Sequence, residues 1–199
     1  MEVIQMRIII LILLSLMGCS SEEQQSAEQD WPNLKYYRSK NLKLSSPSKN
    51  EKRVVFMGNS ITEGWPTLQP EFFEGKSYIN RGISGQTTPQ MLIRFRQDVI
   101  DLQPKLVLIL AGINDIAGNT GPSNVTMITN NIISMAELAK SNKIKVIICS
   151  ILPAKDFPWN PGMNPPPKIL SANQILRSYA LTNGIDYLDY YSSMVDKNN

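Results

Sequence analysis

Three short stretches, each directly after an apolar run, carry residues that can act together in acyl transfer. They are GNSIT (58–62), NRGISGQTT (80–88) and LAGINDI (110–116). Ser60 offers a hydroxyl that becomes a nucleophile once a base accepts its proton. Gly85 can turn its backbone N–H toward a neighbouring strand end, and Asn114 can donate from its side-chain amide, so both could stabilise an oxyanion.

Each of these residues also has an interpretation that involves no chemistry. A serine after a strand is often a helix N-cap, a glycine between two elements often makes a turn, and an asparagine can cap its own turn. Taken singly, Ser60 is better explained as a cap. Only the three stretches together favour a reactive site.

The elements that must position these residues follow from the hydrophobic pattern. Strand-like apolar runs occupy 53–58, 77–82, 105–112 and 145–152, and a fifth begins at Ile185. Between them, helical spacing covers 87–102, 123–143 and 169–184, with Thr88 as the expected N-cap of the first helix and Gly184 just past the end of the last. Alternating strands and helices predict an α/β fold in three layers, α/β/α, with a mostly parallel sheet. The three stretches then lie at the carboxyl ends of strands, where such sheets bind ligands.

Taken in order, the three stretches resemble the sequence blocks of the SGNH, or GDSL-like, family of serine ester hydrolases. Asn59 stands where the family name has Asp. The resemblance runs from about Arg53 to the last strand. It implies a flavodoxin-like sheet, Ser60 as the nucleophile, and an oxyanion hole made of the Ser60 N–H, the Gly85 N–H and the Asn114 side chain, with no cofactor.

The sequence departs from the family pattern at the catalytic base. The family's fourth block, Asp-x-x-His, follows the last strand, and the 199 residues contain no histidine. Asp186 and Asp189 precede the position of that block, so neither takes the acid's role. We expect the chain to be nearly inactive, and we favour a truncated piece of an active enzyme over a complete protein that binds without hydrolysing.

The resemblance leaves the substrate open. A carbohydrate O-acetyl ester or another short-chain acyl ester is the first expectation, and an acyl-lipid or lysophospholipid is the alternative. Trp159, in the Pro-rich stretch 152–168, could stack on a sugar ring or simply pack within its loop. A third hypothesis is an inactive, lipid-anchored module that binds a glycan.

The N-terminus predicts attachment to a membrane. Arg7 precedes an apolar run that is too short for a stable span, and the run ends in Leu16-Met17-Gly18-Cys19, which resembles a bacterial lipobox. We therefore expect a signal peptide over 1–18, lipid on Cys19, a tether and lead-in segment over 19–52, and the hydrolase domain over 53–199. The expected location is the bacterial cell envelope, at the outer membrane or the periplasmic face.

Composition argues against several other classes of protein. A net charge of +3, with 19% charged residues, gives no basic surface for nucleic acid. Neither a phosphate-binding P-loop nor the dinucleotide pattern G-x-G-x-x-G is present. Without histidine, and with no loop rich in carboxylates, a metal site is not expected. Cys149, inside an apolar run, should be a buried free thiol.

Overall fold

A computed structural model describes residues 30–196 of the protein. The chain divides into two units, Met1–Trp31 and Pro32–Asn199, and the fold described here is that of the second. The predicted signal peptide, Cys19 and the first part of the tether lie outside the described residues. Among residues 30–196, no helix combines the length and the apolar character needed to cross a bilayer.

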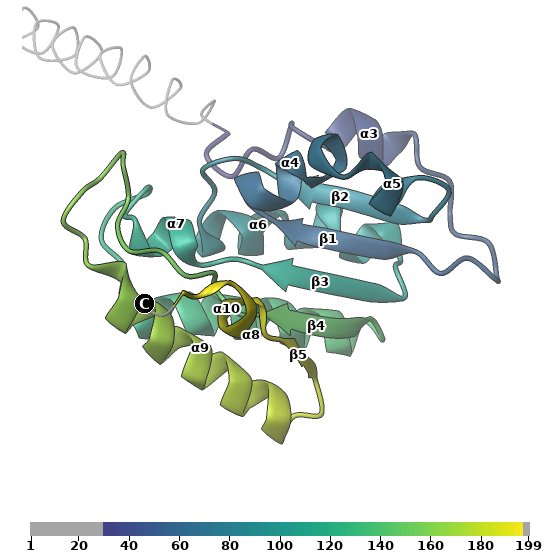
Figure 1. Ribbon diagram of the computed structural model, residues 1–199. Coiled ribbons are helices and arrows are strands. Elements are labelled where there is room, and N and C mark those ends of the chain that lie inside the picture. Colours follow the sequence, from purple (N-terminus) through teal and green to yellow (C-terminus); the bar gives the residue numbers. More distant parts are fainter. Residues whose placement is uncertain (1–29, 197–199) are drawn as a thin grey trace, which may run out of the picture. The chain divides into compact units, whose positions relative to one another are not determined.

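The centre of the fold is a sheet of five parallel strands, in the order β2-β1-β3-β4-β5 (Figure 1). The predicted parallel α/β architecture is confirmed, and each predicted strand is present with slightly shorter ends. The strands are β1 (Val54–Gly58), β2 (Tyr78–Gly82), β3 (Leu106–Leu110), β4 (Lys145–Cys149) and β5 (Asp186–Leu188).

Helices cover both faces of this sheet. The larger core lies on the face that carries Met57, Ile109 and Ile148, which pack against α6, α8 and α9. The other face carries Phe56 and Leu108, which pack against aromatic side chains of α4, α5 and α10. The helices are α3 (Arg38–Leu42), α4 (Ser60–Leu68), α5 (Pro70–Phe73), α6 (Thr88–Asp98), the 3-10 turn η1 (Ile100–Leu102), α7 (Ile113–Ile116), α8 (Val125–Ser141), α9 (Pro165–Thr182) and α10 (Tyr190–Met194).

Two predicted helix boundaries need correction. Thr87, not Thr88, caps α6, because its side chain and that of Gln90 form a reciprocal capping box with the backbone. Helix α9 begins at Pro165, inside the stretch predicted as a loop. Proline fits the first turn of a helix because the N–H that it lacks would have no partner there. The predicted helix end is confirmed, since Gly184 follows the cap Asn183 at φ +62°.

The strand register brings three loops to one edge of the sheet. Gly58 at the end of β1 pairs with Gly82 of β2 on one side and with Leu110 of β3 on the other. The loops that follow these strands therefore start at the same level.

Candidate active site

Ser60 is the first residue of α4, two positions after β1 ends. Asn59 is the N-cap of this helix, and its side-chain oxygen accepts the Ile61 N–H at 3.1 Å. The interpretation of Ser60 as the cap is therefore wrong. The Ser60 side chain is exposed, and its backbone N–H belongs to the first turn of the helix, where N–H groups have no partner within the helix.

Glycines at the strand ends let α4 pack close to the sheet. A Cβ atom at Gly58 would lie 2.0 Å from the Thr62 hydroxyl, and one at Gly82 would lie 2.1 Å from the Glu63 backbone nitrogen. The helix that carries Ser60 thus rests with its first turn almost directly on β2, and side chains larger than hydrogen at these positions would push it away.

Gly85 and Asn114 come from the other two loops, and those loops are joined by a hydrogen bond. Gly85 is exposed and has φ +75°, a conformation that favours glycine. Asn114 is 5% exposed and lies in α7, directly after β3. Its Nδ2 atom donates to the Gln86 backbone oxygen at 3.0 Å. Because an amide nitrogen carries two hydrogens, this bond orients Asn114 and leaves it a second donor.

Asp115, the neighbour of Asn114, fixes the start of α6. Its carboxylate accepts the Thr88 hydroxyl at 2.6 Å and the Thr88 N–H at 3.0 and 3.1 Å. Burial of this side chain raises the pKa of Asp115 to about 6, although the Thr88 hydrogen bonds act in the opposite direction. Asp115 thus stabilises the contact between the Asn114 helix and the helix after the Gly85 loop.

Trp159 is connected to the Gly85 loop through Asn119. The indole is 63% exposed, and its Nε1 atom donates to Asn119 Oδ1 at 3.3 Å. Asn119 Nδ2 in turn donates to the Gly85 oxygen at 3.0 Å. The indole ring also packs against buried Phe157, with 5.2 Å between the ring centroids. The exposed face of Trp159 is therefore oriented by Asn119, which is itself bonded to the Gly85 loop.

An apolar hollow of about 380 Å³ lies next to α4. Ile61, the residue after Ser60, lines it together with Trp65, Leu110 and Leu152. Tyr190 and Met194 of α10 close its other side.

The acids of the last strand have structural contacts. Asp189 caps α10 by accepting the Ser192 N–H at 3.0 Å. Its Oδ2 atom also lies 3.6 Å from Arg177 Nη1. The backbone N–H of Ser192 lowers the pKa of Asp189. Asp186 is exposed in β5. In the described part of the chain, no group of three or more Cys, Asp or Glu side chains is arranged to hold a metal ion.

Sequence reasoning missed Gln86, Arg94 and Asn119. Gln86 and Arg94 are buried, with exposed fractions of 1% and 0%. The available signals were a Gln in the glycine-rich loop and an Arg in the amphipathic helix that follows it. Several of their partners, however, are far away in the sequence.

Comparisons with known proteins agree with the fold described above. The model of the GDSL-like Lipase/Acylhydrolase family matches residues 56–199. The crystal structure of a GDSL-like lipase from Bacteroides thetaiotaomicron is 54% identical, with a TM-score of 0.82, over 84% of this chain and 82% of that one.

Two curated proteins are similar over shorter regions. An arylesterase of Vibrio mimicus is 32% identical over 120 residues, which is 54% of this chain and 58% of that protein. An uncharacterized lipoprotein of Bacillus subtilis is 36% identical over 78 residues, which is 38% of this chain and 32% of that protein. The chain thus spans less than two thirds of either curated relative.

Proposed function

The chain belongs to the GDSL-like lipase/acylhydrolase family, and from this premise we propose that Ser60, Gly85 and Asn114 form the nucleophile and oxyanion hole of an ester-hydrolysing site. The observation that carries the proposal is the position of Ser60. It is exposed at the first turn of α4, at the strand ends from which the Gly85 and Asn114 loops also leave.

The proposed reaction begins with attack of Ser60 Oγ on the acyl carbon. The carbonyl oxygen then carries negative charge, which the N–H groups of Ser60 and Gly85 and the second hydrogen of Asn114 Nδ2 stabilise. Collapse of this intermediate breaks the ester C–O bond; the leaving oxygen takes up the proton that Ser60 gave up, passed on by solvent water, and departs as the alcohol, while the acyl group stays on Ser60. Water attacks the acyl-enzyme and releases the acid.

The proton of Ser60 needs an acceptor, and the 199 residues contain no imidazole. Loss of the base in serine hydrolases lowers turnover about a millionfold, whereas the oxyanion hole and binding alone leave about 10³–10⁴-fold acceleration over water. We therefore propose that this chain by itself hydrolyses esters only slowly.

We propose a short acyl group, such as the acetyl ester of a carbohydrate, as the substrate. The exposed Trp159 indole supports this proposal, because its position beside the Gly85 loop would allow it to stack on a sugar ring. The similarity to an arylesterase supports an aryl ester as a test substrate.

Hydrolysis of longer acyl chains is the second candidate. The apolar hollow next to Ile61 favours it, because its walls could hold an alkyl chain attached to an ester at Ser60. A comparison of p-nitrophenyl acetate with p-nitrophenyl octanoate separates the candidates. A higher kcat/KM for the octanoate would favour the lipid substrate.

The proposed chemistry is tested by supplying the missing base. The chain is lengthened at its C-terminus with a family segment that contains Asp-x-x-His, and hydrolysis of p-nitrophenyl acetate is measured. We expect a rate that Ser60→Ala abolishes, while the unlengthened chain retains only the slow residual rate. A lengthened chain that folds, as judged by circular dichroism, but shows no Ser60-dependent hydrolysis contradicts the proposal. Stable binding of an acetylated glycan without hydrolysis would instead favour a binding module.

A further inference from the structure

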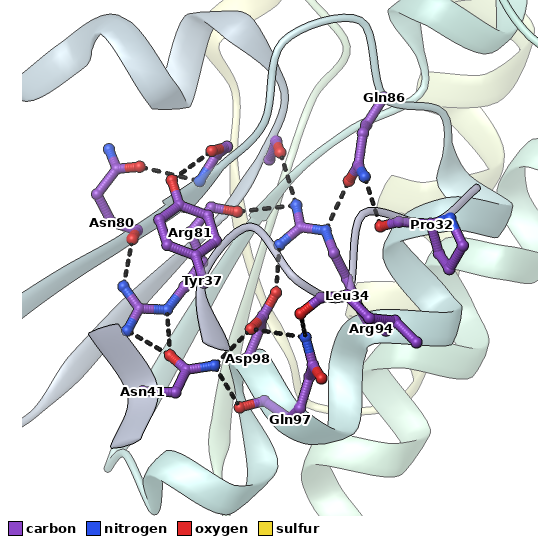
Figure 2. Close-up of polar contacts among 12 residues, drawn as sticks. Pro32, Leu34, Tyr37, Asn41, Asn80, Arg81, Gln86, Arg94, Gln97 and Asp98 are labelled. Carbon is purple, nitrogen blue, oxygen red and sulfur yellow. Dashed lines mark hydrogen bonds and ion pairs between the residues drawn. The ribbon is translucent and has the colours of Figure 1, made fainter. Parts of the chain in front are cut away.

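Gln86 follows Gly85 directly, and its side chain is held on both sides (Figure 2). Its Oε1 atom accepts from Arg94 Nε at 2.6 Å, and its Nε2 atom donates to the Pro32 oxygen at 2.8 Å. Its backbone oxygen accepts from Asn114. One residue therefore connects the Gly85 loop to a helix, to the N-terminal part of the fold and to the Asn114 loop.

Arg94 is the buried residue that connects these contacts. Besides Gln86, it donates from Nη2 to the Gly58 oxygen at 3.1 Å and to the Arg81 oxygen at 2.8 Å. Its Nη1 atom pairs with Asp98 at 2.9 Å, and both side chains are fully buried. A buried charge with these partners is costly to move, because any shift leaves donors unpaired. Arg94 thus ties the end of β1, next to Ser60, to the loop that carries Gly85.

The lead-in segment (residues 32–44) holds the same network from the outside. The Leu34 oxygen accepts from Gln97 at 2.8 Å, and Asn41 donates to Asp98 at 2.7 Å. Asn41 also accepts from Arg81 at 2.6 and 3.0 Å, and the Tyr37 hydroxyl donates to the Gly82 oxygen. This segment, which belongs to the stretch 19–52 predicted as a tether and lead-in segment, packs on β2 and α6.

We infer that Gln86 is a positioning residue for the oxyanion hole. Gly85 is exposed at positive φ, and although its oxygen accepts from Asn119 Nδ2, it has no side chain to fix the direction of its N–H. The buried Gln86 side chain fixes the backbone on one side of Gly85, and its carbonyl fixes the Asn114 amide. The backbone N–H groups of Ser60 and Gly85 then keep a fixed distance from each other, because Arg94 bonds both to the Gly58 oxygen and to the Gln86 side chain. This inference rests on the proposed function of Gly85 and Asn114.

The test uses the chain itself and the slow hydrolysis of p-nitrophenyl acetate that persists without a base. Gln86→Met keeps the side-chain length and removes both hydrogen bonds. Gln97→Met is the matched control, since it removes the bond to Leu34 and a 3.4 Å bond to Asp98 but leaves both side-chain bonds of Gln86 in place. Gln86→Glu keeps an acceptor for Arg94 and loses the donor to the Pro32 oxygen. Asn114→Ala reports on the oxyanion hole directly, and thermal unfolding shows that each variant is folded.

We expect Asn114→Ala to lower kcat about 100-fold and Gln86→Met to lower it about 10- to 100-fold with KM unchanged. Gln97→Met should stay within about twofold, and Gln86→Glu should regain part of the rate through its charge-assisted bond with Arg94. The NMR signals of the Asn114 side-chain amide should shift in Gln86→Met and not in Gln97→Met.

A native rate of hydrolysis in Gln86→Met, together with a strongly lowered rate in Asn114→Ala, would overturn the inference. It would leave the proposed function unaffected. Native hydrolysis in Asn114→Ala would overturn the proposed function itself.

Discussion

At the residue scale, the buried carboxyl of Asp115 makes stability depend on pH. Its pKa is about 6 in the folded chain, against the ordinary value of 3.8. Between these two values the unfolded chain has lost the proton that the folded chain still holds. The free energy of unfolding therefore falls as the pH rises from about 4 to 6, by up to about 3 kcal/mol, and stays lower above that range.

We expect Asp115→Asn to remove this fall, because an amide has no proton to lose and keeps an oxygen for Thr88. Urea unfolding of both proteins between about pH 4 and pH 7 measures the difference. Asp101→Asn, at an exposed acid, serves as the control. Parallel pH profiles for the native chain and Asp115→Asn would disprove the assignment.

At the scale of elements, the close contact between α4 and β2 depends on the absence of a side chain at Gly82. The Cβ of an alanine there would meet backbone atoms of Asn59 and Glu63 at 2.1–2.7 Å, and backbone cannot rotate away as a side chain can. The contact also determines where Ser60 lies relative to the sheet.

We expect Gly82→Ala to lower the free energy of unfolding by about 2–3 kcal/mol. Gly64→Ala, within the same helix, meets nothing within 4 Å and should raise that free energy by about 0.5–1 kcal/mol. Chemical denaturation compares the two. Equal effects of both substitutions would show that the helix shifts easily on the sheet.

The difference between these elements and the side-chain network shows how far the sequence alone could predict the site. Apolar runs and helical spacing locate β1, β2 and β3, and parallel strands bring their carboxyl ends together, so the meeting of the Ser60, Gly85 and Asn114 loops could be predicted. The bond of Gln86 to Pro32, 54 positions away, could not, because no periodicity links residues that far apart. The cap of α6 was misplaced by one residue although the sequence held the signal for it, because the spacing Thr87-x-x-Gln90 is that of a capping box and favours Thr87 over Thr88.

At the scale of the whole molecule, we propose that Cys19 carries lipid and holds the protein on the bacterial envelope. The lipobox-like run before Cys19 and the similarity to a lipoprotein support this. Several acyl chains together would give stable anchoring, whereas one chain gives only marginal binding.

In a bacterial host fed radiolabelled palmitate, we expect label on the native chain and none on Cys19→Ser. Cys149→Ala, which changes the other cysteine, should keep the label and the membrane fraction. Label that persists in Cys19→Ser would rule out this site of attachment.

The burial of Cys149 also has a practical meaning for work on this protein. The side chain is 1% exposed, and burial raises the pKa of its thiol to about 12, so almost no thiolate exists near neutral pH. Oxidants and maleimide reagents need the thiolate and an open path to it. A cysteine introduced on the surface of residues 30–196 would therefore be the fast-reacting thiol of that region. Fluorophores could be attached to the Trp159 loop without first replacing Cys149.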